Sequence, residues 1–187
     1  MKLILAIGGS SGSTYALKLI QWLQANVPTH VRPELVFSSN ALINWEMENG
    51  AFEPAQLGLP IYNNRDFFAP FASGSARYDA MVIIPASMGL IGRIANGISD
   101  DLISRAADVM LKDRRKLIIV PREAPYNLVH LRNMTALCEA GAIICPASPS
   151  FYSQPADIDA LVMTIIHRII DLLGIDSQSK RWGSESL

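Results

Sequence analysis

The stretch LILAIGGSSGSTYALKLIQWL, residues 3–23, indicates the fold class. Its first five residues form an apolar run as long as a buried strand, and the next five form a turn rich in glycine and serine. After the turn, apolar residues recur at helical spacing, at Ala16, Leu19, Ile20 and Leu23. A buried strand, a tight turn and an amphipathic helix form the repeating unit of α/β proteins.

The same unit recurs along the rest of the chain. Further strands are predicted over residues 34–37, 80–84, 117–120 and 142–145, with Pro85 ending the second of these. Helices are predicted over about 40–48, 89–96, 101–112, 127–140 and 155–173. Residues 50–77 are predicted to form an irregular, partly ordered loop. Strands that are apolar on both faces predict a parallel sheet covered by helices on two sides, within one domain over residues 1–175; the polar tail, 176–187, is expected to be frayed or used in subunit contacts.

Composition limits the classes of function. Half of the 187 residues are hydrophobic and only 18% are charged, which favours an oligomer that covers apolar surface. The formal net charge of -1 gives no reason to expect a nucleic-acid partner. No apolar run reaches the ~20 residues that span a bilayer, so no membrane partner is expected. Cys138 and Cys145 form neither a CxxC motif nor a disulfide framework, which indicates a reduced, cytoplasmic protein with no metal site.

Turns rich in small residues follow two of the predicted strands, at the sheet edge where parallel sheets bind ligands. Residues 8–12 read GGSSG, which lets a helix N-terminus face an anion or a flavin edge but lacks the GxGxxG dinucleotide pattern. Residues 85–89 read PASMG, where Ser87 can cap a helix or bind phosphate, and Ser38 adds a third hydroxyl. Each turn alone is equally compatible with a purely structural role, but the pair favours a cofactor that carries phosphate.

Charged residues give weaker signals. Arg105 and Lys112 are seven residues apart and therefore share one helix face, where charges are usually solvated. Arg122 and Glu123 follow a strand directly, at the edge where catalytic groups collect, or they form a structural ion pair. Arg168 lies off the apolar stripe predicted for the last helix, which comprises Ile158, Leu161, Val162, Ile165, Ile169 and Leu172. None of these features alone decides a function.

Taken together, the segments resemble the UbiX flavin prenyltransferase family over nearly the whole chain. The resemblance is carried by IGGSSGSTYAL (7–17), FAPFASGS (68–75), SRAADVMLKDRRKLIIVPREAPYNLVHLRNM (104–134) and GAIICPASPSFYSQP (141–155). It implies a Rossmann-like (flavodoxin-like) three-layer sandwich that binds reduced FMN at the carboxyl edge of the sheet, between subunits of a homododecamer. It also implies transfer of a dimethylallyl group from dimethylallyl phosphate to N5 and C6 of FMN, and delivery of the prenylated FMN to a UbiD-type decarboxylase.

The resemblance also implies roles for individual residues. It places the FMN site at Gly9, Ser10, Ser11, Ser38, Ser87, Met88, Gly89, Leu90 and Arg122. It assigns the phosphate of the donor to Arg105, Lys112, Tyr152 and Arg168. Glu123 corresponds to the family's acid/base residue, Glu48 to a second carboxylate, and Phe67 to an aromatic face for the allyl cation. Two residues depart from the family pattern: Leu90 stands where threonine is frequent, and Phe67 where many members carry tryptophan.

The implied chemistry suits these residue types. Cleavage of an allylic C–O bond builds negative charge on the leaving phosphate, which fixed cations and a tyrosine hydroxyl stabilise. Magnesium is then dispensable, and the chain has no DDxxD motif. A nearby carboxylate can transfer protons while the new bonds form, and an aromatic face can shelter the allyl cation.

Two alternatives use the same fold. A flavin-dependent cysteine decarboxylase is expected to carry a histidine before the third strand, but His30, His130 and His167 all lie outside residues 50–85. A non-catalytic FMN-binding assembly subunit has no use for a second phosphate site.

Overall fold

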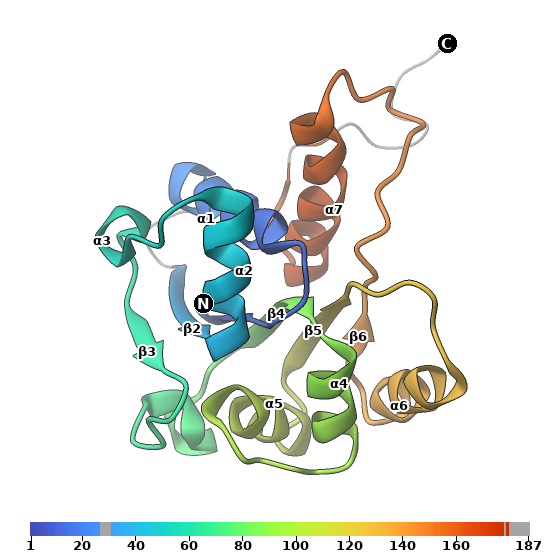
Figure 1. Ribbon diagram of the computed structural model, residues 1–187. Helices are drawn as coiled ribbons and strands as arrows, with labels where there is room; N and C mark the ends of the chain where they lie inside the picture. Colours follow the sequence, from blue (N-terminus) through green and yellow to red (C-terminus); the bar gives the residue numbers. More distant parts are fainter. Residues whose placement is uncertain (27–30, 178, 180–187) are drawn as a thin grey trace.

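The computed structural model describes residues 1–26, 31–177 and 179. Its strands form one parallel sheet in the order β3-β2-β1-β4-β5-β6 (Figure 1). The strands are β1 (Lys2–Ile7), β2 (Arg32–Phe37), β3 (Ile61–Asn63), β4 (Ala80–Ala86), β5 (Lys116–Pro121) and β6 (Ile143–Ile144). The helices are α1 (Ser13–Asn26), α2 (Ser39–Asn49), α3 (Pro54–Leu57), α4 (Met88–Ala95), α5 (Leu102–Lys112), α6 (Leu128–Glu139) and α7 (Ile158–Leu173). This is the Rossmann strand order, and the order reverses between β1 and β4, where such folds bind ligands.

Helices cover both faces of the sheet and make the three layers that the sequence predicts. α1 and α7 lie on one face, and α4, α5 and α6 lie on the other (Figure 1). Alternate residues of β1 supply the two cores, because Leu3, Leu5 and Ile7 belong to the first cluster and Ile4 and Ala6 to the second.

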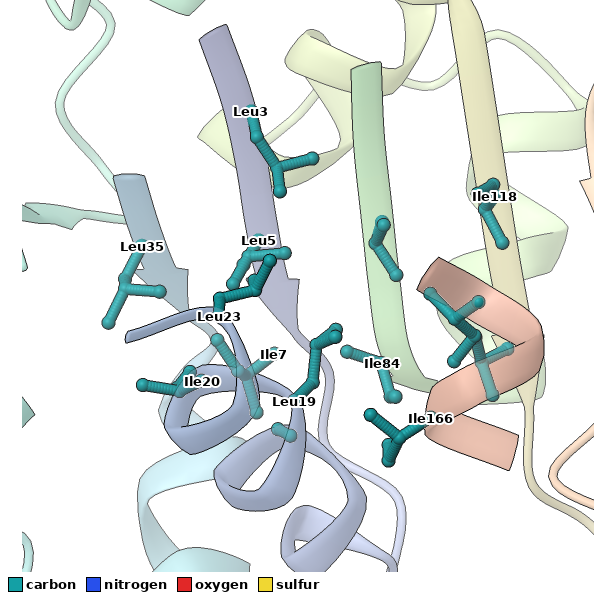
Figure 2. Packing of buried hydrophobic residues seen from close by; sticks show 14 of the residues in the cluster. Leu3, Leu5, Ile7, Leu19, Ile20, Leu23, Leu35, Ile84, Ile118 and Ile166 are labelled. Carbon is teal, nitrogen blue, oxygen red and sulfur yellow. The ribbon is translucent and has the colours of Figure 1, made fainter. Parts of the chain in front are cut away.

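The core between the sheet and α1 and α7 shows how the apolar spacing of the sequence is used. Figure 2 shows Leu19 and Leu23 of α1 facing the side chains of β1, while Ile166 of α7 lies near Ile84. Burying one such side chain fully contributes about 1.5–3 kcal/mol. This packing fixes the strands from whose ends the candidate site is built.

The segment predicted as an irregular loop contains a strand, so that prediction is wrong in part. β3 pairs in parallel with β2, with Leu35 opposite Ile61 and Phe37 opposite Asn63. None of its three residues is fully buried. β3 is the edge strand of the sheet and is partly exposed, so the sequence contains no apolar run at this position. The same segment also holds α3 and two short 3-10 helices, Pro70–Ala72 and Gly74–Ala76.

Two smaller predictions are corrected. β4 does not end at Pro85 but continues to Ala86, because its pairing with β5 shifts register at this point and the ladder needs no N–H from the proline. α7 begins at Ile158 instead of 155, after the Asp157 cap.

The buried face of α7 also differs from the predicted stripe. Ile158 is 76% exposed, Leu161 and Leu172 are only partly buried, and Ile166, Ile170 and Leu173 are buried instead. In the described residues, no helix is both long and apolar enough to cross a membrane. Residue 178 and residues 180–187, which make up most of the predicted tail, lie outside the described residues.

Candidate functional site

A cavity of about 500 Å³ opens at the carboxyl ends of β1, β2, β3 and β4. Its volume lies in the range of small-molecule sites. Four of the residues predicted for FMN line it, namely Gly9, Ser38, Ser87 and Leu90. The wall also includes apolar and aromatic side chains from Phe37, Leu42, Phe52, Ile61, Tyr62 and Ile103. The cavity therefore combines a polar end with apolar surface on which a flat ring can pack.

Two helix N-termini open on this cavity. The Ser38 hydroxyl caps α2 by accepting a hydrogen bond from Ala41 N–H at 3.1 Å. The Ser87 hydroxyl caps α4 by accepting one from Leu90 N–H at 3.4 Å. Both serines are thus helix caps, a role that the sequence predicts for Ser87 only, and both also line the cavity. Helix N-termini attract anions, so a phosphate is favoured here.

The glycine loop brings β1 and α2 close together. A Cβ atom on Gly9 would lie 2.5 Å from Cβ of Asn40, so only glycine allows the start of α2 to approach this closely. The neighbouring Ser10 hydroxyl is buried and has no hydrogen-bond partner among the described residues. A buried hydroxyl without a partner costs about 1–3 kcal/mol. The loop therefore suits a polar ligand such as FMN.

Glu48 of α2 is tied to the same loop. Its carboxylate accepts hydrogen bonds from Gly12 N–H at 2.9 and 3.0 Å and from the Ser13 hydroxyl at 2.7 Å. Burial alone raises the pKa of Glu48, but hydrogen bonds from Ser13, Gly12 and Ser11 outweigh it and leave the pKa below its ordinary value. The carboxylate is thus held ionised beside the loop.

Arg122 and Glu123 follow β5 at the same edge of the sheet. Arg122 donates from Nε to the carbonyl oxygen of Ser11 at 2.8 Å, which ties β5 to the glycine loop. Glu123 is exposed, and its carboxylate accepts a hydrogen bond from Ala124 N–H at 3.1 Å. The two residues make no ion pair with each other in the described chain, which removes the main argument for the structural alternative.

Arg105 and Lys112 share one face of α5, as their spacing predicts. Arg105 donates from Nε to the carbonyl oxygen of Ala72 at 3.0 Å and pairs with Asp108 at 2.9 Å. Lys112 pairs with Asp113 at 2.5 Å, and a Cβ atom on Gly74 would lie 3.1 Å from Lys112 Nζ. Both cations therefore border the segment with the two 3-10 helices, outside the cavity lining.

Tyr152, Arg168 and Phe67 lie elsewhere on the molecule. Tyr152 is 58% exposed in the loop before α7, and Phe67 is 46% exposed after β3. Arg168 is exposed on α7. Its positive charge lowers the pKa of the nearby Cys145 thiol, but burial of the thiol has the larger effect and leaves this pKa raised. Because α5 and α7 cover opposite faces, the sheet separates Arg105 from Arg168 within one chain. The four residues assigned to the donor phosphate are not gathered by a single chain.

Several cavity residues were not predicted from the sequence. Asn63 ends β3, and Asn64 and Arg65 follow it; all three line the cavity because of this strand, which the sequence pattern does not reveal. Arg93 and Asp101 also line it. For Arg93 a signal was available, since it lies in the helix that Ser87 caps, three residues after Leu90. Of the predicted FMN residues, Ser10, Ser11, Met88, Gly89 and Arg122 lie next to the cavity in sequence or by contact without lining it.

The comparisons with known proteins cover nearly the whole chain. The family model described as Flavoprotein matches residues 1–173. A flavin prenyltransferase UbiX from Methanocaldococcus jannaschii is 43% identical, over 98% of this chain and 100% of that protein. A crystal structure of AnUbiX in complex with FMN and dimethylallyl pyrophosphate superposes with a TM-score of 0.91 at 35% identity, covering 99% of this chain and 98% of the other. A dodecameric FMN-dependent UbiX-like decarboxylase from Escherichia coli O157:H7 superposes with a TM-score of 0.92 at 37% identity, covering 98% and 100%.

Proposed function

The chain belongs to the flavoprotein family and, within it, to the UbiX-type flavin prenyltransferases, and on that premise we propose that it transfers a dimethylallyl group from dimethylallyl phosphate to reduced FMN. The observation that carries the proposal is the cavity at the switch point of the sheet, on which two capped helix N-termini open; the unpaired hydroxyl of Ser10 lies on the adjoining glycine loop. A flavin phosphate and ring suit this combination of polar and apolar wall. We further propose residues 1–175 as the FMN-binding unit.

Within this function, the glycine loop and the two serine caps hold FMN. When bound, reduced FMN supplies N5 and C6 as the atoms that receive the dimethylallyl group. Arg122 holds the loop through the carbonyl of Ser11, and Glu48 holds it through Gly12 N–H, so both position the loop against the ligand. These contacts limit motion of the reacting partners, which is a large part of catalysis in reactions between two substrates.

The donor phosphate is assigned to Arg105, Lys112, Tyr152 and Arg168. Their positive charges and hydroxyl stabilise the charge that develops on the phosphate as the C–O bond breaks. Glu123 is exposed at the carboxyl edge, where its carboxylate can take up or return a proton. Phe67 presents a ring that can stabilise the allyl cation.

We propose that the complete site forms between subunits. One chain places the cations of α5 and the Arg168 of α7 on opposite faces of its sheet, so neighbouring chains must supply the missing members. Exposed apolar side chains on α6 and in the loop before α7 offer surface for such contacts, including Leu128, Val129 and Phe151. A dodecamer, the assembly of the Escherichia coli relative, is the arrangement we propose. The product, prenylated FMN, is proposed to pass to a UbiD-type decarboxylase, and the cytoplasm is the proposed compartment.

The test is anaerobic incubation of the protein with reduced FMN and dimethylallyl monophosphate, followed by mass analysis of the released flavin. We expect a flavin heavier by one dimethylallyl group, and none when the donor is omitted. A parallel sample with dimethylallyl pyrophosphate shows which donor is used. An unchanged flavin with both donors, from a protein that binds FMN, would contradict the proposed function.

A further inference from the structure

Arg93 gives the cavity a positive group that the mechanism above does not use. Ser87, the N-cap of α4, and Leu90 and Arg93 within the helix follow one another at intervals of three residues, and all three line the cavity. Side chains at this spacing lie on one side of a helix, and they point back toward its N-terminus. Arg93 therefore lines the same cavity as Ser87, the residue that caps the end of α4 at which a phosphate is expected.

The first turn of α4 offers an anion little side-chain support. The hydroxyl of Ser87 already accepts a hydrogen bond from Leu90 N–H. Leu90 is buried and apolar, so its side chain can donate no hydrogen bond. A phosphate at this wall needs another donor, and Arg93 is the next residue along the same side of the helix.

Two carboxylates fix the orientation of the Arg93 guanidinium. Nη1 lies 3.3 Å from an oxygen of Asp100, and Nη2 lies 3.2 Å from Asp101. Asp101 is itself only 5% exposed and caps α5 through Ser104 N–H at 2.8 Å. Because Asp101 is held by α5, the guanidinium is held with it, and little side-chain entropy remains to be lost when a ligand binds.

The third nitrogen of the Arg93 guanidinium, Nε, has no acceptor among the described residues. This atom is buried, although the side chain as a whole is 36% exposed. Buried donors in proteins are nearly always paired, so an unpaired one in a cavity wall calls for an explanation. A ligand oxygen in the cavity would pair it.

Arg65 adds a second positive charge to this wall. It lines the same cavity, and its Nη1 donates to the backbone carbonyl of Asp100 at 2.9 Å. Arg65 and Arg93 together balance the charges of Asp100 and Asp101. The wall therefore does not repel an anion.

We infer that the Nε atom of Arg93 donates a hydrogen bond to the phosphate group of FMN and supplies the side-chain contact that Leu90 cannot make. The inference rests on the proposed function, since it names a residue that holds the phosphate of the proposed cofactor. Arg93 is then the residue of this chain that discriminates FMN from riboflavin, which differs from FMN only by the phosphate.

The experiment compares the binding of FMN and riboflavin to the oligomeric protein by flavin fluorescence. In Arg93→Ala we expect the affinity for FMN to fall by about tenfold or more, as for loss of a hydrogen bond to a charged group, while the affinity for riboflavin changes by less than about twofold. Arg93→Lys keeps a cation beside the two carboxylates, but a single ammonium group cannot pair with both carboxylates and with the phosphate. Its preference for FMN over riboflavin should therefore fall between those of the wild-type protein and Arg93→Ala. Arg32→Ala removes the same charge from the exposed start of β2, at the opposite end of the sheet, and should leave both affinities unchanged.

The possible outcomes distinguish a failure of the Arg93 inference from a failure of the proposed function. Equal losses for FMN and riboflavin would show that Arg93 only supports the fold through Asp100 and Asp101, and unchanged FMN affinity would show that the phosphate lies elsewhere; either result overturns the inference. If Arg93→Ala does not fold, the FMN preference of Arg93→Lys decides, and a wild-type preference there also overturns it. Prenyl transfer by the wild-type protein is measured alongside, because its absence would instead refute the proposed function.

Discussion

The cavity at the carboxyl edge and the cations of α5 and α7 differ in how complete they are within one chain. Around the cavity, residues from β1, α2 and β5 contact one another through Gly12, Glu48, Ser11 and Arg122. The donor-phosphate residues show no such convergence, because Arg105 lies on one face of the sheet and Arg168 on the other. We therefore propose that one chain forms most of the flavin site, whereas the site for the donor phosphate requires assembly.

This difference has a physical cause. The flavin region lies where consecutive parallel strands end side by side, so sheet pairing alone brings its residues together. Residues on helices that cover opposite faces are separated by the sheet. A site that needs both kinds of residue therefore requires a neighbouring molecule. Flavin binding and prenyl transfer should therefore respond differently to mutation and to mixing of subunits.

The largest effect is expected from Arg168→Ala. Removing a cation that stabilises the leaving phosphate should lower the rate of prenyl transfer by about 10²–10³-fold, because its charge acts mainly in the transition state. Affinity for FMN should stay within about twofold of wild type, because Arg168 lies across the sheet from the cavity wall on α4. The rate is measured by mass analysis of the flavin, and the affinity by fluorescence. Glu123→Gln should likewise lower prenyl transfer while FMN affinity is retained. Full turnover by both variants would contradict the roles proposed for Arg168 and Glu123.

Mixing subunits tests the assembly directly. Arg105→Ala and Arg168→Ala should each be nearly inactive alone, but co-expressed as mixed oligomers in equal amounts they should recover roughly a quarter of the wild-type activity. That fraction follows if each site takes Arg105 from one chain and Arg168 from another, since each position is then intact in half of the cases. If both residues of a site come from the same chain, mixed oligomers should show no recovery, and the proposal of sites shared in this way would be wrong.

The smallest effect is expected on stability, from the contacts of Glu48 with the glycine loop of residues 8–12. Glu48→Gln should lower the free energy of unfolding by about 1 kcal/mol at neutral pH, discounted for the exposure of the side chain. The folded state lowers the pKa of Glu48, so the stabilisation is present above the unfolded pKa of about 4.3 and is lost as the pH falls through the lower folded value. Denaturant unfolding of the variant and wild type should therefore converge below about pH 4.

Glu46→Gln provides the matched control for this change. It removes the same charge from the same helix, at an exposed position that makes no hydrogen bond to the loop in the described structure. It should change stability by less than about 0.5 kcal/mol, as surface substitutions usually do. Equal destabilisation by both variants would show that the contacts of Glu48 with the glycine loop contribute nothing measurable.

Regular apolar spacing predicted most of the fold. The run over residues 3–7 and the helical spacing of Leu19 and Leu23 are local patterns, and both became buried elements of the first core. β3 was missed because an edge strand of three partly exposed residues carries no such pattern. Because β3 leaves no pattern in the sequence, the place of Asn64 and Arg65 in the cavity wall could not be predicted either.

By itself the sequence determined the alternation of strands and helices, the two turns at the carboxyl edge and the residue types suited to phosphate, because each of these is encoded within a few consecutive residues. Only the tertiary structure decided that Glu48 contacts the glycine loop and that Asp101 orients Arg93. It also decided that the sheet lies between Arg105 and Arg168, two cations proposed to bind the phosphate of the prenyl donor. Those relations join residues on different elements. They follow from how the helices pack on the sheet, which no local stretch of the chain specifies.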